Sequence, residues 1–162
     1  MVFLMWSGAF LKHDGKVLLL RRSETRRYHP GKWSYIGGNI EIGETPIEAC
    51  YREITEESGI SRESVISLNL LYILIRQTGG ELRQNYIYFG ESLHDNVIDT
   101  DEGQLSWVNE NELAQYDFSA TYKAMIEHYM ARNPADRNLY VGVSEIENDI
   151  LNMTFTKCED FG

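Results

Sequence analysis

Cysteine is scarce in this sequence. The 162 residues include two cysteines, Cys50 and Cys158. Two cysteines give no disulfide framework of the kind that stabilises small secreted domains, so we expect reduced thiols and a cytoplasmic protein. No internal repeat or low-complexity segment divides the chain, and its length fits one main domain that buries a real hydrophobic core.

Basic residues are also in short supply. Lys and Arg total 15 against 25 Asp and Glu, which gives a net charge of −10. Proteins that bind a nucleic-acid polymer hold its phosphates with a surplus of Lys and Arg, so this balance disfavours such a partner. Small phosphorylated substrates stay open, because a bound metal ion neutralises their charge locally.

Long apolar runs are absent. No segment approaches the roughly 20 residues that a membrane helix needs, so no membrane partner is expected. The apolar residues 1–11 have no Lys or Arg ahead of them and no recognisable cleavage region, and we interpret them as a buried strand instead of a signal peptide.

Residues 38–60, GNIEIGETPIEACYREITEESGI, are the stretch that indicates a chemistry. Thr45 followed by Pro46 predicts the start of a helix, and Gly59 predicts its end. At about 100° per residue, one side of this helix is apolar and suited to packing on a sheet. That side is expected to consist of Ile47, Cys50, Tyr51 and Ile54.

Three carboxylates fall on another side of the predicted helix. Glu53, Glu56 and Glu57 have the spacing i, i+3, i+4, which places their Cβ atoms roughly 5–6 Å apart. Like charges so placed repel unless a cation lies among them, and oxygen ligands are those that Mg²⁺ prefers. Arg52 is expected to orient carboxylates, through i, i+4 pairs with Glu48 and Glu56.

Two glycines, Gly37 and Gly38, come just before this helix. They allow a tight turn in which the backbone approaches a metal or a phosphate closely. A solvated acidic helix is the ordinary interpretation of a Glu-rich stretch, but it does not explain the glycines. Together these features predict a metal site built from a loop and a helix.

This pattern resembles the Nudix box. Gly38, five residues, Glu44, seven residues and then residues 52–60, REITEESGI, fill every fixed position of that box. The chain is therefore identified as a member of the Nudix (MutT-like) hydrolase family over about residues 3–132. The resemblance implies an α/β fold, the Nudix-type α/β/α sandwich with a mixed β-sheet between helices. It also implies hydrolysis of the diphosphate linkage of a nucleoside diphosphate attached to another group.

The resemblance implies a metal centre in that fold. Glu53, Glu56, Glu57 and the Gly38 carbonyl are expected to hold Mg²⁺ or Mn²⁺. One of Glu53, Glu56 or Glu102 would then deprotonate the attacking water, and the family does not fix which.

Other residues are expected to support this centre. Glu102 lies in an acidic loop that resembles the family's downstream acidic position, with Asp101 as the substitute candidate. Glu44 and Arg52 are expected to contact the loop and the ligands without touching the metal, and so to fix their positions.

A basic stretch follows the second predicted strand. Arg21 and Arg22 close that strand and are candidates for binding substrate phosphate, with a solvated surface pair as the alternative. The loop 23–32 after them is locally basic and borders the same region.

The expected substrate is a nucleoside triphosphate, including oxidised purine forms, cleaved to nucleoside monophosphate and pyrophosphate. Family members that prefer ADP-ribose tend to carry a proline beyond the box, and this chain has none between Pro46 and Pro134. ADP-ribose or a nucleotide sugar is the alternative substrate. A non-catalytic sensor of nucleotide ligands with the same fold is the alternative class of protein.

The rest of the chain predicts a sheet and a tail. We expect a Nudix hydrolase domain at residues 1–135 and a C-terminal extension at residues 136–162, which forms an added β-hairpin or a contact in a homodimer. The expected partner is a small-molecule nucleoside diphosphate derivative. Strands are predicted at 2–11, 16–22, 65–78, 82–91 and 104–108, and a helix at 119–132.

Overall fold

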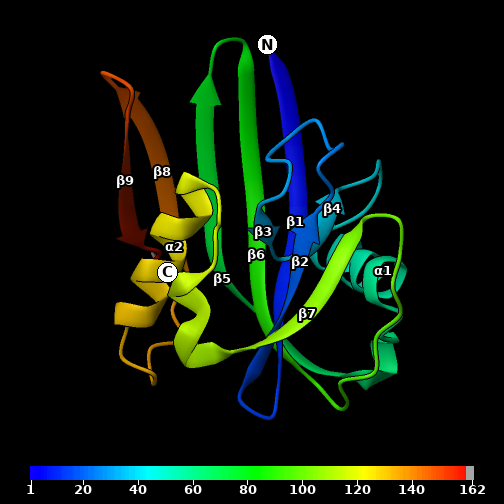
Figure 1. Cartoon of the computed structure of the whole chain (residues 1–162). Helices are drawn as coiled ribbons and strands as arrows, with labels where there is room; N and C mark the ends of the chain where they lie inside the picture. The colour runs from blue at the N-terminus through cyan, green and yellow to red at the C-terminus, as the bar shows by residue number, and fades with distance from the viewer. Residues whose placement is uncertain (160–162) are drawn as a thin grey trace.

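The computed structural model describes residues 1–159, in which nine strands form one sheet (Figure 1). The same residues also form two α-helices and two short 3₁₀ helices. The strands are β1 (Val2–His13), β2 (Lys16–Arg22), β3 (Trp33–Ser34), β4 (Ile36–Asn39), β5 (Val65–Thr78), β6 (Glu81–Ser92), β7 (Gly103–Asn109), β8 (Tyr140–Glu147) and β9 (Ile150–Lys157). The helices are α1 (Pro46–Ser58), α2 (Ala120–Ala131), η1 (Arg62–Ser64) and η2 (Glu110–Gln115).

The sheet is mixed. Its order is β3-β2-β1-β6-β5-β8-β9, with β4 also paired to β1 and β7 to β2. The pairs β1–β6 and β5–β8 are parallel, whereas the remaining pairs are antiparallel. The predicted α/β fold with a mixed sheet between helices is confirmed.

Alternation along β1 divides the core between the two faces of the sheet. Phe10 packs with the α2 side chains Met125 and Ile126, whereas its neighbours Ala9 and Leu11 pack in the core that contains α1. Side chains of a strand point alternately to opposite faces, so α1 and α2 cover different faces. The run Val17, Leu18, Leu19 and Leu20 of β2 is fully or almost fully buried, as its apolar sequence predicts.

Helix α1 begins and ends where the sequence predicts. The Thr45 hydroxyl accepts a hydrogen bond from the Glu48 amide, the Glu48 carboxylate accepts one from the Thr45 amide, and Gly59 is left-handed with φ 77°. Cys50 and Ile54 are buried as expected, but Ile47 is 39% exposed. The sheet therefore leaves part of the first helical turn uncovered.

Beyond α2, residues 140–157 form a β-hairpin at the edge of the sheet (Figure 1). Strand β8 lies parallel to β5, from the pair Tyr72 and Tyr140 to the pair Arg76 and Ser144. Phe155 of β9 stacks on His128 of α2, with ring centroids 4.4 Å apart. The hairpin thus extends the same sheet, and whether residues 1–135 form a domain without it stays a prediction.

Within the part of the chain that the structure describes, no helix has the length and apolar character that spanning a membrane requires.

Candidate functional site

Strand β4 brings the two glycines against helix α1. Gly37 and Gly38 pair with Gly8 and Ser7 of β1. A Cβ atom added at Gly38 would overlap the carboxylate of Glu53. A side chain at position 38 would therefore move that carboxylate out of the place it holds in this structure.

Glu57 is the most deeply buried of the predicted ligands. It is 4% exposed, and its Oε2 atom accepts a hydrogen bond from the Gly37 N–H at 3.1 Å. Burial, together with repulsion from the nearby carboxylates of Glu53 and Glu102, raises the pKa of Glu57 to about 8. A buried carboxylate that other carboxylates repel is a group that a cation would stabilise.

Arg52 holds most of the other carboxylates. Its guanidinium donates hydrogen bonds to Glu53 at 2.9 Å, to Glu56 at 3.2 Å and to Glu44 at 2.6 and 3.0 Å. The predicted pair with Glu56 is therefore present. The predicted pair with Glu48 is wrong, because Glu48 turns back to cap Thr45 at the start of the helix.

The contact between Arg52 and Glu44 fixes the loop ahead of the helix. Glu44 also accepts the Glu41 amide at 2.9 Å, and Arg52 also donates to the Asn39 carbonyl at 2.9 Å. The hydrogen bond from Arg52, followed by the one from the Glu41 amide, lowers the pKa of Glu44 to about 2. Glu44 is thus ionised at neutral pH and anchors the arginine.

Glu53 is both partly buried, like Glu57, and hydrogen-bonded to Arg52, like Glu44. Burial raises its pKa, the hydrogen bond from Arg52 opposes that shift, and Glu56 and Glu102 reinforce it. The Glu56 side chain is more open, at 58% exposure. Glu53 and Glu57 therefore face inward, whereas Glu56 faces solvent.

Glu102 comes to this site from the loop before β7. It lies within electrostatic reach of Glu53 and Glu57, and its carboxylate pairs with Arg26 of the loop between β2 and β3. The sequence indicated that this loop is basic, but it gave no signal that Arg26 would meet Glu102, which lies 76 positions further along the chain.

The two predicted phosphate ligands lie in different surroundings. The Arg21 side chain is 49% exposed, lies 3.8 Å from Glu24 and donates to the Gly31 carbonyl. Arg22 is more enclosed: it donates to the Tyr28 carbonyl at 2.9 Å, and burial followed by repulsion from Arg26 lowers its pKa. Arg22 lies within electrostatic reach of Glu57.

The chemistry of the side chains gathered here fits a hard divalent cation. Carboxylate and carbonyl oxygens are the donors, as Mg²⁺ prefers, and the charge of Arg26 offsets only part of the effects that raise the pKa of Glu57. In the arrangement described for residues 1–159, no three His, Cys, Asp or Glu side chains converge closely enough to enclose an ion. Instead, Arg52 donates hydrogen bonds to Glu53 and Glu56, and the Gly37 amide donates one to Glu57.

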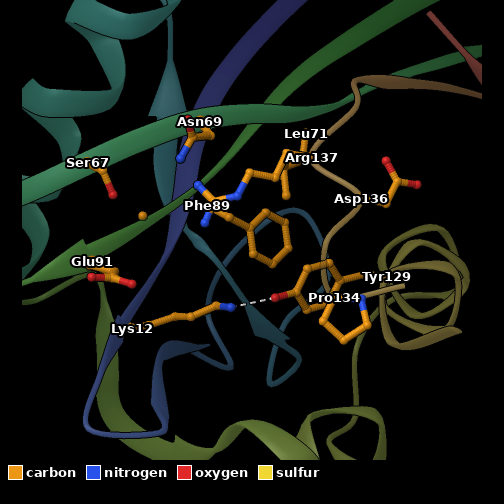
Figure 2. A pocket seen from close by; sticks show the side chains of 11 residues that line it. Lys12, Ser67, Asn69, Leu71, Phe89, Glu91, Tyr129, Pro134, Asp136 and Arg137 are labelled. Carbon is orange, nitrogen blue, oxygen red and sulfur yellow. Dashed lines mark hydrogen bonds between the residues drawn. The ribbon is translucent and has the colours of Figure 1, made fainter. Parts of the chain in front are cut away.

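Another hollow lies away from these residues, between strands β5 and β6 and the segment that follows α2. Figure 2 shows it, with Lys12 pointing at the Tyr129 hydroxyl, which lies 2.6 Å from Lys12 Nζ. Lys12 also pairs with Glu110 at 2.7 Å. The cavity, about 130 Å³, is lined by none of the predicted site residues, so the hollow and the acidic cluster are separate features.

Comparison with known proteins assigns the family. The model described as the NUDIX domain matches residues 7–129. The protein called nucleoside triphosphatase NudI, from Salmonella paratyphi B, is 33% identical over 121 residues, which cover 67% of this chain and 84% of that protein.

Solved structures agree on the fold. The MutT protein of Bacillus halodurans superposes with a TM-score of 0.76 at 21% identity and covers 94% of this chain and 97% of its own. An Ap4A hydrolase of C. elegans superposes with a TM-score of 0.65 at 21% identity, over 79% of this chain and 96% of its own. At these identities the structures bear on the fold alone. The fold and the family match together place this chain in the Nudix family, as a Nudix pyrophosphohydrolase.

Proposed function

We propose that this protein hydrolyses nucleoside triphosphates, including oxidised purine forms, to nucleoside monophosphate and pyrophosphate. The observation that carries this proposal is the 33% identity to a relative named as a nucleoside triphosphatase, over 84% of its length. The chain also lacks a proline between Pro46 and Pro134. Members of the family that prefer ADP-ribose tend to have one there.

We further propose that Glu53, Glu56, Glu57 and the Gly38 carbonyl hold Mg²⁺ or Mn²⁺. The raised pKa of buried Glu57 supports this assignment, because a cation beside it would favour the ionised form. Held there, such an ion would supply positive charge to offset the charge that develops on the phosphate oxygens.

The proton of the attacking water would pass to Glu53, Glu56 or Glu102. Each is supported by a different feature: Glu53 by its burial beside Gly38, Glu56 by its exposure, and Glu102 by its position on a separate loop. Conservative Gln variants of the three are compared at saturating metal, because Glu53 and Glu56 are also proposed metal ligands. A general base lost from the reaction lowers kcat by about 10²–10⁴-fold even when the metal is bound.

Around this centre, Glu44 and Arg52 would hold the loop and the carboxylates in place. Arg22 and Arg21 would bind phosphate oxygens of the substrate, and Arg22 is the better supported because it lies near Glu57. The substrate is a small nucleotide. We also propose that the extension at residues 136–162 contributes to a homodimer.

The test is a panel of nucleotides assayed with Mg²⁺ or Mn²⁺ for release of monophosphate, pyrophosphate and phosphate. It includes triphosphates, ADP-ribose, nucleotide sugars and dinucleoside polyphosphates. Glu56→Gln and Glu57→Gln are expected to abolish metal-dependent turnover, whereas Glu63→Gln, an exposed carboxylate of η1, keeps it. A strong preference for ADP-ribose or a nucleotide sugar would refute the triphosphate assignment. Binding without any turnover would point to a sensor instead.

A further inference from the structure

One face of the sheet extends well beyond the helix that packs on it. Helix α1 contacts β1 and β4, and in Figure 1 it lies on the side of β4 and β7, away from β5, β8 and β9. Helix α2 packs on the opposite face, where it meets Phe10 of β1. The face on which α1 lies therefore continues across β6, β5 and β8, past the strands that this helix contacts.

Strand pairing identifies the side chains on this face. The Ser7 hydroxyl of β1 donates a hydrogen bond to the Pro46 carbonyl at the start of α1, so Ser7 and Met5, two positions before it, point to this side. Residues paired with these two across the sheet point the same way and form two rows. The apolar members of the two rows, which we call the open face, are Met5, Ile73, Ile75, Tyr86, Val141 and Val143.

The open face is partly exposed, whereas the other side of the same strands is buried. On β5, Tyr72 and Leu74 are 0% and 2% exposed. Ile73 and Ile75, which alternate with them, are each partly exposed. Val143 on β8 is 41% exposed. Folding of one chain thus leaves a contiguous apolar area in water, and such areas mark interaction sites.

Within the described strands, neither row contains a charged side chain. The other members of the rows are Ser7, Gln84, Thr154 and Thr156. The chain as a whole carries a net charge of −10, so two copies repel each other where their acidic surfaces approach. The open face adds nothing to that repulsion and offers no ion pair to a charged partner. An equally apolar and uncharged surface, that of a second copy, matches it.

The size of this area fits a weak association. Five strands span roughly 24 Å, and the two rows with the next one, which begins at Phe3, extend about 17 Å along the strands. The area is therefore about 400 Å² when taken as flat, and two copies in contact bury at least about 800 Å². That value is near the lower limit for specific association, so a dimer formed here is reversible and depends on concentration.

We propose that the open face is the contact surface of a homodimer, in which the sheets of two copies pack face to face about a two-fold axis. Sheets that pack in this way lie about 10 Å apart with their apolar side chains interdigitated. A two-fold axis places the same residues on both sides of the contact. Val141 and Val143 belong to the extension at residues 136–162, so this inference rests on the homodimer of the proposed function and gives it an interface.

Sedimentation equilibrium of the full chain at increasing concentration tests the proposal without any substrate. The average mass is expected to rise from 18.7 kDa toward twice that value. Val143→Glu places like charges in the contact and should weaken association about 100-fold or more. The matched control is Ile146→Glu on the same strand, where the side chain is 50% exposed. Ile146 lies three positions from Val143 and so points to the other face, and its variant should associate as the wild type does.

Two further measurements keep the test decisive if Val143→Glu does not fold. Met5→Glu introduces the same charge from β1, at a side chain that is 43% exposed. The methyl signals of Ile73 and Val141 in the wild type should shift with concentration, which needs no substitution.

The possible failures can be told apart. A wild type that stays at 18.7 kDa throughout overturns both the interface and the homodimer. A dimer that both glutamate variants leave intact overturns the interface alone. In that case, protection from hydrogen exchange confined to the amides of β9 would locate the contact at the edge of the sheet. Absence of hydrolysis refutes the proposed reaction only, because none of these measurements requires turnover.

Discussion

Glu57 on helix α1, which is almost completely buried, accepts a hydrogen bond from the amide of Gly37 on strand β4, with 3.1 Å between the nitrogen and Glu57 Oε2. Glu57→Gln keeps an oxygen for that hydrogen bond and removes a charge that Glu53 and Glu102 repel. We expect the metal-free variant to gain about 1–3 kcal/mol in unfolding free energy at pH 8. Activity should fall about 100-fold or more, because the group proposed to bind the metal is lost.

Chemical denaturation and pyrophosphate release measure these two effects of Glu57→Gln. Glu63→Gln is the matched control and should change neither quantity. A variant that is both less stable and fully active would contradict the assignment.

The raised pKa of Glu57 also predicts a pH dependence. Between its usual value near 4.5 and about 8, the folded protein binds a proton that the unfolded chain has lost. Stability of the metal-free protein should therefore fall as pH rises through this range. Adding Mg²⁺ at pH 7 should release protons, which calorimetry in buffers of different ionisation enthalpy detects. The release should disappear in Glu57→Gln, and its persistence there would show that another group titrates.

Gly38→Ala tests the close approach of backbone to Glu53. The added methyl group would overlap the Glu53 carboxylate and force it aside, so metal affinity and kcat should drop about tenfold or more. Gly80→Ala is the matched control, because Gly80 lies in a turn where an added Cβ meets nothing within 4 Å. Titration of Mn²⁺ followed by paramagnetic relaxation gives the affinity of each variant. Equal affinities would exclude the proposed role of this loop.

Arg52 is expected to act through the carboxylates it holds. Arg52→Gln should lower unfolding free energy by about 1–3 kcal/mol, because Glu44 loses both of its hydrogen bonds from the guanidinium. Arg52→Lys should recover only part of this, since an ammonium group cannot reproduce the planar fork. Thermal melts compare the two with Arg62→Gln, in which a surface arginine stacked on Tyr51 is removed. Full recovery by lysine would mean that charge alone matters.

The tail hairpin is expected to contribute to stability as part of the sheet. Phe155→Ala removes ring contacts with His128 and Tyr72 and should lower unfolding free energy by about 2 kcal/mol. Phe3→Ala, at a position 66% exposed, is the control and should have little effect. A chain ended at residue 135 tests the predicted domain directly. If the shortened chain is as stable as the wild type, the hairpin does not contribute to stability and this prediction is wrong.

Several features of this protein follow from the sequence because they depend on neighbours along the chain. Thr45, Pro46 and Gly59 set the limits of α1 through local hydrogen bonds and backbone preferences. The spacing of Glu53, Glu56 and Glu57 fixes the order of the carboxylates on the helix, since the helical period does not depend on the rest of the fold. The same local order made the Nudix box recognisable.

Tertiary structure decided which groups these residues meet. Arg52 turns to Glu44 and away from Glu48, Glu102 reaches the site from a loop 45 positions beyond Glu57, and Arg26 meets it there. The packing of α1 on the sheet buries Glu57 but leaves its neighbour Glu56 exposed. This burial raises the pKa of Glu57. Contacts of this kind join residues far apart in the chain, and no local pattern specifies them.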